Sequence, residues 1–447
     1  MRQLQYFKKV IIILLACLGL LFSCNKNSFL NKKPSSDLVV PSTLNDFQAL
    51  LDNDVVIQET PELGEVSADD IYLSSSAWTG PYITAKEQNA YIWSANIYNG
   101  QGGVEDWDDP YQQVFYANIV LEGLPKIPVD SNNVQLWKFV QGSAYFIRAY
   151  AFYNLAQLFA PVYTSATISE PGIFLRENSA IEQTSIRANV QQTYDTILAD
   201  LHAAASLLSK DRDISHLNRP SKPAVLAMLA RVYLSMQNYD SADFYATSCL
   251  KFDGTLLDYN SRRSAPHFDM ANPEILYQSH LLRNSGIFGG RFYPTQIDSG
   301  LYQSYADSDL RKAFFYTPGG KLNDTYSTTV HPFSGLAVDE VYLIRAECSA
   351  RENDTVQAIN DVNNLLLNRF VTNFFMPYST NTPAVLDIVL EERRKELALR
   401  GLRWTDLRRL NALEANITLR RYLFGTVDTL GPTDQRYVLP VPPDVPH

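Results

Sequence analysis

The chain has 447 residues, of which 46% are hydrophobic and 19% are charged; this is typical of a folded globular protein and excludes an intrinsically disordered one. Its formal net charge of -10 excludes a general nucleic-acid-binding protein, because such a protein needs a basic surface for phosphates. Four cysteines exclude a disulfide scaffold. The 26 tyrosines indicate a surface suited to contacts, because Tyr combines a flat apolar ring with a polar tip.

The N-terminus has the features of an export signal. Basic residues precede an apolar run over 10–22 that is too short to span a bilayer. The run ends at Ser23-Cys24, and a small residue before a Cys at this place resembles the lipobox of bacterial lipoproteins. We therefore expect residues 1–23 to be a signal peptide and Cys24 to be the site of lipid attachment. Cleavage of an ordinary signal peptide at another position is the alternative.

Two cysteines remain in the body of the chain. Cys249 and Cys348 each lie in a segment with helical periodicity, which favours two small buried thiols. A disulfide between them stays open, because the sequence does not fix their distance.

Apolar residues recur at steps of three and four along several segments of the body, as the buried face of a helix requires. The predicted helices cover 107–124, 137–159, 193–208 and 224–236, and a further helical pair covers 341–367 with a turn at 351–354.

Two segments match the tetratricopeptide pattern, in which small residues 12 positions apart let antiparallel helices approach closely. These alanine pairs are Ala230 with Ala242 and Ala346 with Ala358. Tyr233 adds the aromatic residue three positions after the first alanine. Together these hairpins predict a helical-repeat scaffold.

The stretches 52–106 and 252–340 are different. They are rich in Gly, Pro, Ser, Asn and aromatic residues, with weak periodicity. Long irregular stretches in a compact protein are usually functional or disordered, and the aromatic content argues against disorder. We expect ordered loops with short helices and strands, packed on the helical scaffold.

The segment 387–410 alternates arginines with carboxylates, which predicts a structural ion network rather than a nucleic-acid surface. Glu391 and Lys395 have the spacing of a helical ion pair. Gly401 is expected to end the first helix, and Asp406 to start a second short one.

This segment resembles the most recognisable motif of the SusD/RagB family of Bacteroidetes surface lipoproteins. The matching residues are Glu392, Arg393, Arg394, Glu396, Gly401, Arg403, Trp404, Asp406 and Arg408. Weaker matches follow the family's order along nearly the whole chain: Phe29-Leu30 with Pro34, then Trp107, Tyr111 and Asn118, then Arg148-Ala149-Tyr150, and finally Leu439 to Pro442. The chain departs from the family at Arg400, Leu402 and Thr405, where we expect individual packing contacts to differ.

The resemblance implies a mainly α fold, in which a tetratricopeptide-like helical-hairpin scaffold carries a packed, loop-rich ligand-binding region. We expect an N-terminal region at 24–250 with the first hairpins. A C-terminal region at 251–447 is expected to hold the loop-rich ligand part, the last hairpin and the charged helix.

The resemblance also implies a lipid-anchored outer-membrane protein, facing the cell exterior, that is not an enzyme. It would bind an oligosaccharide or other nutrient and deliver it to a SusC-like TonB-dependent transporter, with no cofactor, metal or nucleic acid. A peptide ligand, as in the RagB branch, is the alternative.

A sugar ligand would stack its C–H faces on aromatic rings and bond its hydroxyls to polar side chains. No family motif fixes the contact residues. The candidates are Trp78, Tyr82, Arg291, Tyr293 and Tyr302, with Phe288, Phe292 and Tyr305 in the same stretch as the last three. Trp93 has the setting of a core residue.

Two other functions are open from the residues alone. A glycosidase would need paired carboxylates in a cleft, and Asp69-Asp70, Asp106 with Asp108-Asp109, and Glu391-Glu392 are available. No nucleophile elbow, metalloprotease motif or phosphate loop accompanies them. A helical-repeat protein that binds only protein partners is the other alternative.

Overall fold

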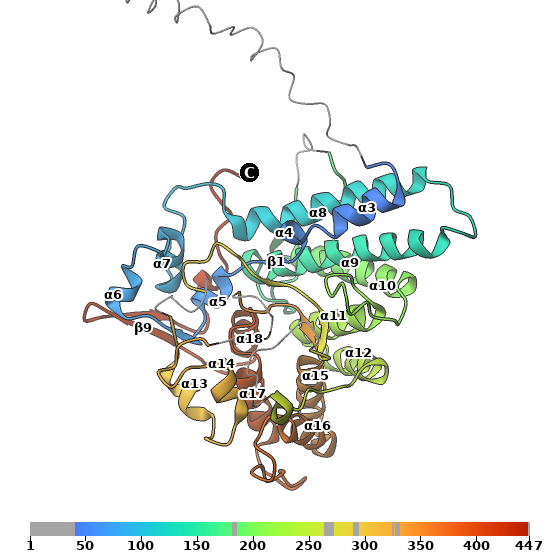
Figure 1. The fold of residues 1–447 in the computed structure, drawn as a ribbon. Coiled ribbons are helices and arrows are strands. Elements are labelled where there is room, and N and C mark those ends of the chain that lie inside the picture. Colours follow the sequence, from blue (N-terminus) through green and yellow to red (C-terminus); the bar gives the residue numbers. More distant parts are fainter. Residues whose placement is uncertain are drawn as a thin grey trace, which may run out of the picture. The chain divides into compact units, whose positions relative to one another are not determined.

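The long helices pack on one another, with the short helices α3 (Leu44–Leu51) and α4 (Asp54–Ile57) against α8 (Glu105–Gly123) and α9 (Val134–Phe159). Most of the other short elements lie on the opposite side of residues 43–447 (Figure 1). The computed structural model describes residues 41–180, 186–262, 272–288, 295–323, 326 and 331–445. The predicted signal peptide and Cys24 lie outside these residues. The chain divides into two units, residues 1–42 and 43–447, and the described helices and strands all belong to the second.

The long helices pack as antiparallel hairpins along the chain. They are α8 (Glu105–Gly123), α9 (Val134–Phe159), α10 (Val190–Leu207), α11 (Lys222–Ser235), α12 (Tyr239–Phe252), α15 (Val338–Arg351) and α16 (Thr355–Leu367). Contacts join α8 and α10 to α9, α11 to α12, and α15 to both α12 and α16. The helices predicted from periodicity are confirmed, and the predicted mainly α, tetratricopeptide-like scaffold is correct.

The local sequence explains where several of these helices begin. Asn189 caps α10 through a capping box with Gln192, because its side chain accepts the Gln192 N–H at 2.7 Å. Pro223 stands in the first turn of α11, where its missing N–H is not needed. Asp354 caps α16 by accepting the Gln357 N–H at 3.0 Å.

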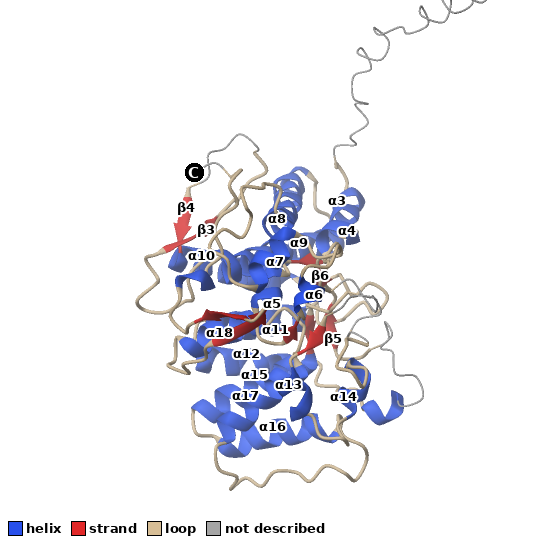
Figure 2. Cartoon of the chain, turned by 90° about the vertical axis from the view of Figure 1, so that its left-hand side faces the viewer, coloured by secondary structure: helices blue, strands red, loops and turns tan. Residues whose placement is uncertain are grey.

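Small and aromatic residues let the hairpins pack closely. Ala230, Ala242, Ala346 and Ala358 are all fully buried, as the repeat spacing predicts. Beside the first pair, the ring of Tyr233 stacks on that of Tyr245 with centroids 5.4 Å apart. Figure 2 shows α11, α12, α15, α17 and α16 arranged as successive layers of one stack.

A buried ion pair joins the first three long helices. The guanidinium of Arg148 on α9 donates from Nε and Nη2 to Asp200 on α10, at 2.8 and 2.7 Å. Its third donor reaches Asn118 Oδ1 on α8 at 2.9 Å. Arg148 therefore fixes the relative positions of α8, α9 and α10, which gives the Arg-Ala-Tyr motif a structural role.

The irregular stretches contain short elements, as expected. The helices are α3 (Leu44–Leu51), α4 (Asp54–Ile57), α5 (Leu63–Ser67), α6 (Ser75–Trp78), α7 (Ala85–Tyr91), α13 (Ser299–Ser304) and α14 (Leu310–Phe315). Single turns of 3-10 helix cover Leu124–Lys126, Tyr259–Arg262 and Gln435–Tyr437.

The strands form two-stranded sheets. β1 (Glu59–Thr60) pairs in parallel with β6 (His280–Leu281). The antiparallel pairs are β2 (Ile71–Tyr72) with β7 (Gln296–Ile297), β3 (Pro171–Phe174) with β4 (Arg187–Asn189), β5 (Ile275–Tyr277) with β8 (Leu336–Ala337), and β9 (Leu419–Leu423) with β10 (Thr426–Leu430). Pairs such as β1–β6 and β2–β7 join the two irregular stretches to each other.

The charged C-terminal segment forms α17 (Val385–Glu396) and α18 (Arg403–Asn411). The predicted end of the first helix at Gly401 is wrong, because α17 stops at Glu396 and Leu399 already has a left-handed φ of 61°. Gly401 does adopt a left-handed φ of 73°, but in the loop between the helices. The second short helix is present as predicted, but it begins at Arg403, and Asp406 lies in its first turn.

Cys249 and Cys348 are both buried free thiols in the structure. Burial raises the pKa of each, so the thiolate is disfavoured. Among the residues that the structure describes, no helix is both long and apolar enough to cross a membrane.

Candidate functional site

Trp78 ends the short helix α6 and is held by its own polar group. Its indole Nε1 donates to the carbonyl of Gln88 at 3.0 Å, and Gln88 Nε2 donates back to the carbonyl of Trp78 at 2.9 Å. The indole is half-buried. Because its N–H is already used, the part that faces solvent offers a ligand only an aromatic surface.

The hairpin of β9 and β10 brings a second aromatic ring to Trp78. Phe424 and Gly425 form its two-residue loop, and both have positive φ, 50° and 77°. The ring of Phe424 meets the Trp78 indole edge to face, with centroids 6.0 Å apart and planes at 73°. The Phe424 N–H donates to Ser75 Oγ at 2.9 Å, which attaches the tip of the hairpin to α6.

Arg421 fixes the base of the same hairpin. Its guanidinium is buried and donates to backbone carbonyls of Val66, Ala68, Ile71 and Tyr91. It also lies over the Tyr91 ring, 4.1 Å from the centroid. The hairpin is therefore anchored on the N-terminal irregular stretch from base to tip. Figure 1 shows β9 beside α6 on the side of the protein opposite α12.

Tyr82 and the stretch after residue 284 meet through one buried carboxylate. Glu87 Oε1 accepts the backbone N–H groups of Gly286 and Ile287 at 2.7 and 3.0 Å, while Oε2 accepts that of Thr84 at 2.7 Å. A Cβ on Gly286 would lie 2.0 Å from the carbonyl oxygen of Tyr82, so only glycine fits this close approach. The Tyr82 side chain is 67% exposed.

Tyr82, in the first set of candidates, lies beside Gly286, just before the second set at 288–305. Not every candidate residue lies at the surface. Tyr302 is half-buried on α13, with the Lys312 ammonium 5.2 Å from its ring centroid and the Tyr316 ring at 6.1 Å. Arg291, Phe292 and Tyr293 lie outside the described residues.

Two of the candidate aromatic residues are core residues. Phe288 and Tyr305 are buried, and Tyr305 Oη donates to the Lys395 carbonyl at 2.6 Å. The prediction that these two contact a ligand is therefore wrong. Trp93 is buried, as predicted, and donates from Nε1 to the Ser67 carbonyl at 2.9 Å.

Sequence reasoning missed Phe424, although a signal exists. Leu419 and Leu423 lie an even number of positions apart, as on one face of a strand, and a glycine follows Phe424 at the expected turn of a β-hairpin. Nothing in the sequence indicates that this hairpin packs against α6.

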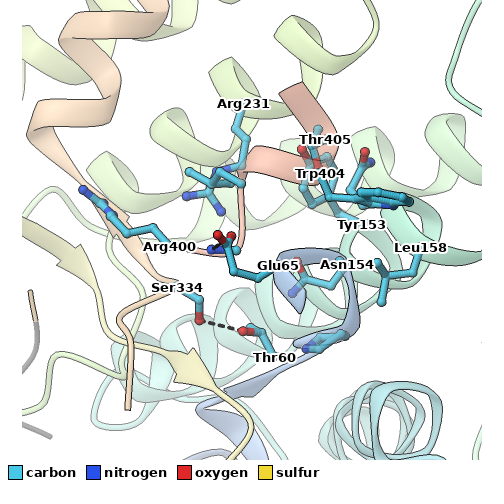
Figure 3. A pocket seen from close by; sticks show the side chains of 15 residues that line it. Thr60, Glu65, Tyr153, Asn154, Leu158, Arg231, Ser334, Arg400, Trp404 and Thr405 are labelled. Carbon is cyan, nitrogen blue, oxygen red and sulfur yellow. Dashed lines mark hydrogen bonds between the residues drawn. The ribbon is translucent and has the colours of Figure 1, made fainter. Parts of the chain in front are cut away.

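Three small spaces lie among the described residues. The first measures about 30 Å³. Figure 3 shows the side chains that line it, which include Glu65, Asn154 and Trp404. Two further cavities measure about 20 and 10 Å³. A buried water needs about 10–15 Å³ by this measure, so each of these spaces is about the size that holds one or two water molecules.

The motif between Glu392 and Arg408 is largely buried and does not form part of the aromatic surface around Trp78. Arg393 Nε donates to Asp406 at 2.9 Å, and Arg403 Nε donates to Asp69 at 2.6 Å. Burial raises the pKa of Asp406, but the charges of Arg393 and Arg409 outweigh it and hold that pKa at about 2. The Gly401 N–H donates to Glu65 Oε2 at 2.9 Å.

Other members of the motif join distant parts of the chain. Arg394 donates to Asp70 at 2.8 Å, and Glu396 accepts from Arg369 at 2.7 Å. Glu392 accepts from Arg311 at 2.7 Å. Arg408 donates to the carbonyl of Gln157 on α9 and to that of Ala160 at the end of α9. Trp404 is buried, and its ring lies 4.7 Å from that of Tyr437.

These contacts connect α17 and α18 to α9, α14 and the N-terminal irregular stretch. The predicted pair of Glu391 and Lys395 is present at 3.1 Å. Within the described ranges, no group of three or more His, Cys, Asp or Glu side chains is placed to hold a metal ion.

Comparison with protein families gives two matches in different parts of the chain. Residues 28–234 match a SusD-like family described as starch-binding and associating with the outer membrane. Residues 336–437 match the SusD family.

Two curated relatives come from Formosa agariphila. SusD-like protein P2 is 25% identical, and the match covers 68% of this chain and 71% of that protein. SusD-like protein P38 is also 25% identical, but the match covers 44% of this chain and only 37% of that protein's length.

Solved structures share the fold over most of the chain. A SusD superfamily protein from Bacteroides thetaiotaomicron superposes with a TM-score of 0.73 at 20% identity, covering 90% of this chain and 96% of that one. A putative sugar-binding protein from Bacteroides vulgatus has a TM-score of 0.70 at 21% identity, covering 90% and 95%. A laminarin-binding SusD-like protein has a TM-score of 0.60 at 17% identity, covering 89% and 95%. With both family matches, the ordered motifs and this shared fold, the chain belongs to the SusD/RagB family.

Proposed function

We propose that this protein binds an oligosaccharide at the cell surface and delivers it to a SusC-like TonB-dependent outer-membrane transporter. The observation that carries the proposal is the aromatic surface around Trp78, because its polar end is bonded internally while its ring remains partly open to solvent. A rigid aromatic face of this kind suits the C–H face of a pyranose ring.

The surroundings of Trp78 support a pre-organised site. Capping of α6 by Ser74, the Gln88 bonds and the Ser75 contact to Phe424 hold the surface without a ligand. Pre-organisation reduces the entropy lost on binding. Tyr82 adds an exposed aromatic side chain on the same segment.

The placement at the membrane rests on the sequence and the family. The lipobox-like Ser23-Cys24 supports an anchor at Cys24, and one family match is described as associating with the outer membrane. The helical scaffold supports packing on a large partner, because stacked helical hairpins offer an extended surface.

We infer binding without catalysis. Two of the candidate carboxylates are engaged in structural contacts: Asp106 accepts the N–H groups of Glu62 and Leu63 at 2.8 Å each, and Asp69 pairs with Arg403. Two free carboxylates facing a sugar are required for hydrolysis. Incubation of the purified protein with glycans should therefore release no reducing ends.

The experiment that tests the proposal has two parts. A glycan and peptide array with the purified protein should show binding to glycans, and isolation of the protein from outer membranes should recover a TonB-dependent transporter. Binding to peptides alone would favour the peptide-uptake alternative. Recovery of protein partners with no small ligand would favour the scaffold alternative.

A further inference from the structure

Phe424 occupies a backbone conformation that disfavours its side chain. Positive φ at both loop positions, 50° at Phe424 and 77° at Gly425, defines the tight hairpin turn that Asn-Gly or Asp-Gly normally forms. A bulky residue at the first position is an outlier, because its Cβ approaches the backbone carbonyl. Such strain persists where the surrounding structure holds it, and it clusters at functional sites.

The exposure of Phe424 adds to this conflict. Its side chain is 63% exposed, and its neighbours on the outer face of the hairpin, Tyr422 and Val427, are 60% and 52% exposed. Tyr422 and Val427 are cross-strand partners, so the tip and the outer face form one apolar surface. An exposed apolar hairpin favours unwanted association, which natural proteins usually avoid with charged residues.

The structure holds the ring in place despite this strain. The Phe424 N–H bonds to Ser75 Oγ at 2.9 Å, and Arg421 anchors the strand below it through four backbone carbonyls. The Phe424 ring lies 6.0 Å from that of Trp78, on a backbone that these contacts restrain.

We propose that Phe424 is a ligand-contact residue that completes the Trp78 surface, so that the C-terminal hairpin supplies part of the binding site. The ligand is a pyranose-containing oligosaccharide that contacts both rings. This inference rests on the proposed function, because it concerns the same surface. It explains why Phe occupies a turn position that Asn would satisfy without strain.

The test uses two substitutions of Phe424 and a matched control. Phe424→Asn removes the ring and fits the turn, so the melting temperature should stay the same or rise. Phe424→Leu keeps an apolar side chain of similar bulk without the aromatic face. Phe244→Ala is the control, because Phe244 is 62% exposed on α12, which Figure 1 places on the other side of the protein.

Calorimetric titration with a glycan that the wild-type protein binds on the array gives the readout. Phe424→Asn and Phe424→Leu should each lower affinity about 10-fold, the effect of removing a central aromatic contact, while Phe244→Ala leaves it unchanged. Unchanged affinity in both Phe424 variants, with the wild type still binding, would overturn this inference alone. Absence of glycan binding by the wild type would overturn the proposed function and this inference together. A lower melting temperature of Phe424→Asn with full affinity would show that the ring serves packing only.

Discussion

The carboxylate of Glu87 accepts the backbone N–H of Gly286 at 2.7 Å, although 199 residues separate them in the sequence. The same side chain caps α7 through Thr84, so one carboxylate both starts a helix and holds a distant loop. This contact places Gly286, within the second irregular stretch, beside Tyr82. The arrangement of the aromatic surface therefore depends on a residue that no ligand needs to touch.

Replacing Glu87 with Ala should destabilise the protein by about 3 kcal/mol. The substitution leaves the buried N–H groups of Gly286 and Ile287 without an acceptor, and each such group costs about 1–3 kcal/mol. Urea unfolding measures the change. Glu105→Ala is the control, because Glu105 is 46% exposed, pairs with Lys86 at 3.2 Å and should contribute less than about 1 kcal/mol. Equal effects of the two substitutions would show that Glu87 does not hold the loop.

Arg148→Ala should cost about 3–5 kcal/mol, because it leaves the carboxylate of Asp200 buried without its partner. Arg148→Lys should recover only part of this, since an ammonium cannot form the two parallel bonds. Arg219→Ala is the matched control: its pair with Asp52 is about one-quarter exposed and should be worth about 1 kcal/mol or less. Denaturant midpoints of the three variants give the comparison. A loss for Arg148→Ala no larger than that for Arg219→Ala would contradict the role assigned to this motif.

Asp109→Asn should stabilise the protein at alkaline pH. Burial raises the pKa of Asp109 to about 7, and the nearby carboxylates of Glu59, Glu105, Asp106 and Asp108 add to the shift. The folded state therefore holds a proton that the unfolded chain releases near pH 4, so the stability from Asp109 is present below pH 4 and lost as the pH rises through 7.

The asparagine variant should accordingly gain about 1 kcal/mol over the wild type at pH 8, after allowance for solvent screening of this partly exposed group, and nothing at pH 4. Unfolding curves at both pH values measure the difference. A gain that is the same at both pH values would show that the carboxylate charge is not the cause.

Cys249 and Cys348 should resist thiol reagents in the native protein. Both are buried, and burial raises the pKa of each thiol, so few thiolates are present at pH 8. Labelling with a chromogenic disulfide should be slow in buffer and should reach both thiols in denaturant. Rapid labelling without denaturant would contradict the packing described around these helices.

The sequence predicts the helical scaffold well because helix packing requires small residues at a regular spacing within a short segment. Ala230 and Ala242 are 12 positions apart, as the repeat pattern requires, and both are fully buried in the structure. The end of α17 is less predictable. Gly401 has the left-handed φ that marks a helix end, but Leu399 has one too and breaks the helix first.

The aromatic surface shows the limit of local signals. Trp78 and Tyr82 could be selected from their irregular, aromatic surroundings, but the same reasoning selected Phe288 and Tyr305, which are buried. Exposure depends on contacts such as that of Tyr305 with the Lys395 carbonyl, 90 residues away. Phe424 escaped selection because its neighbour Trp78 lies at the other end of the chain.

Binding of glycans to the wild-type protein and to Trp78→Ala is the most direct test of the central claim. With an oligosaccharide such as laminarihexaose or maltoheptaose that the wild type binds, calorimetry should show about a 10-fold or greater loss of affinity in Trp78→Ala and none in Phe244→Ala. Unchanged affinity in Trp78→Ala, or a wild type that binds peptides and no glycan, would contradict a glycan-binding surface at Trp78.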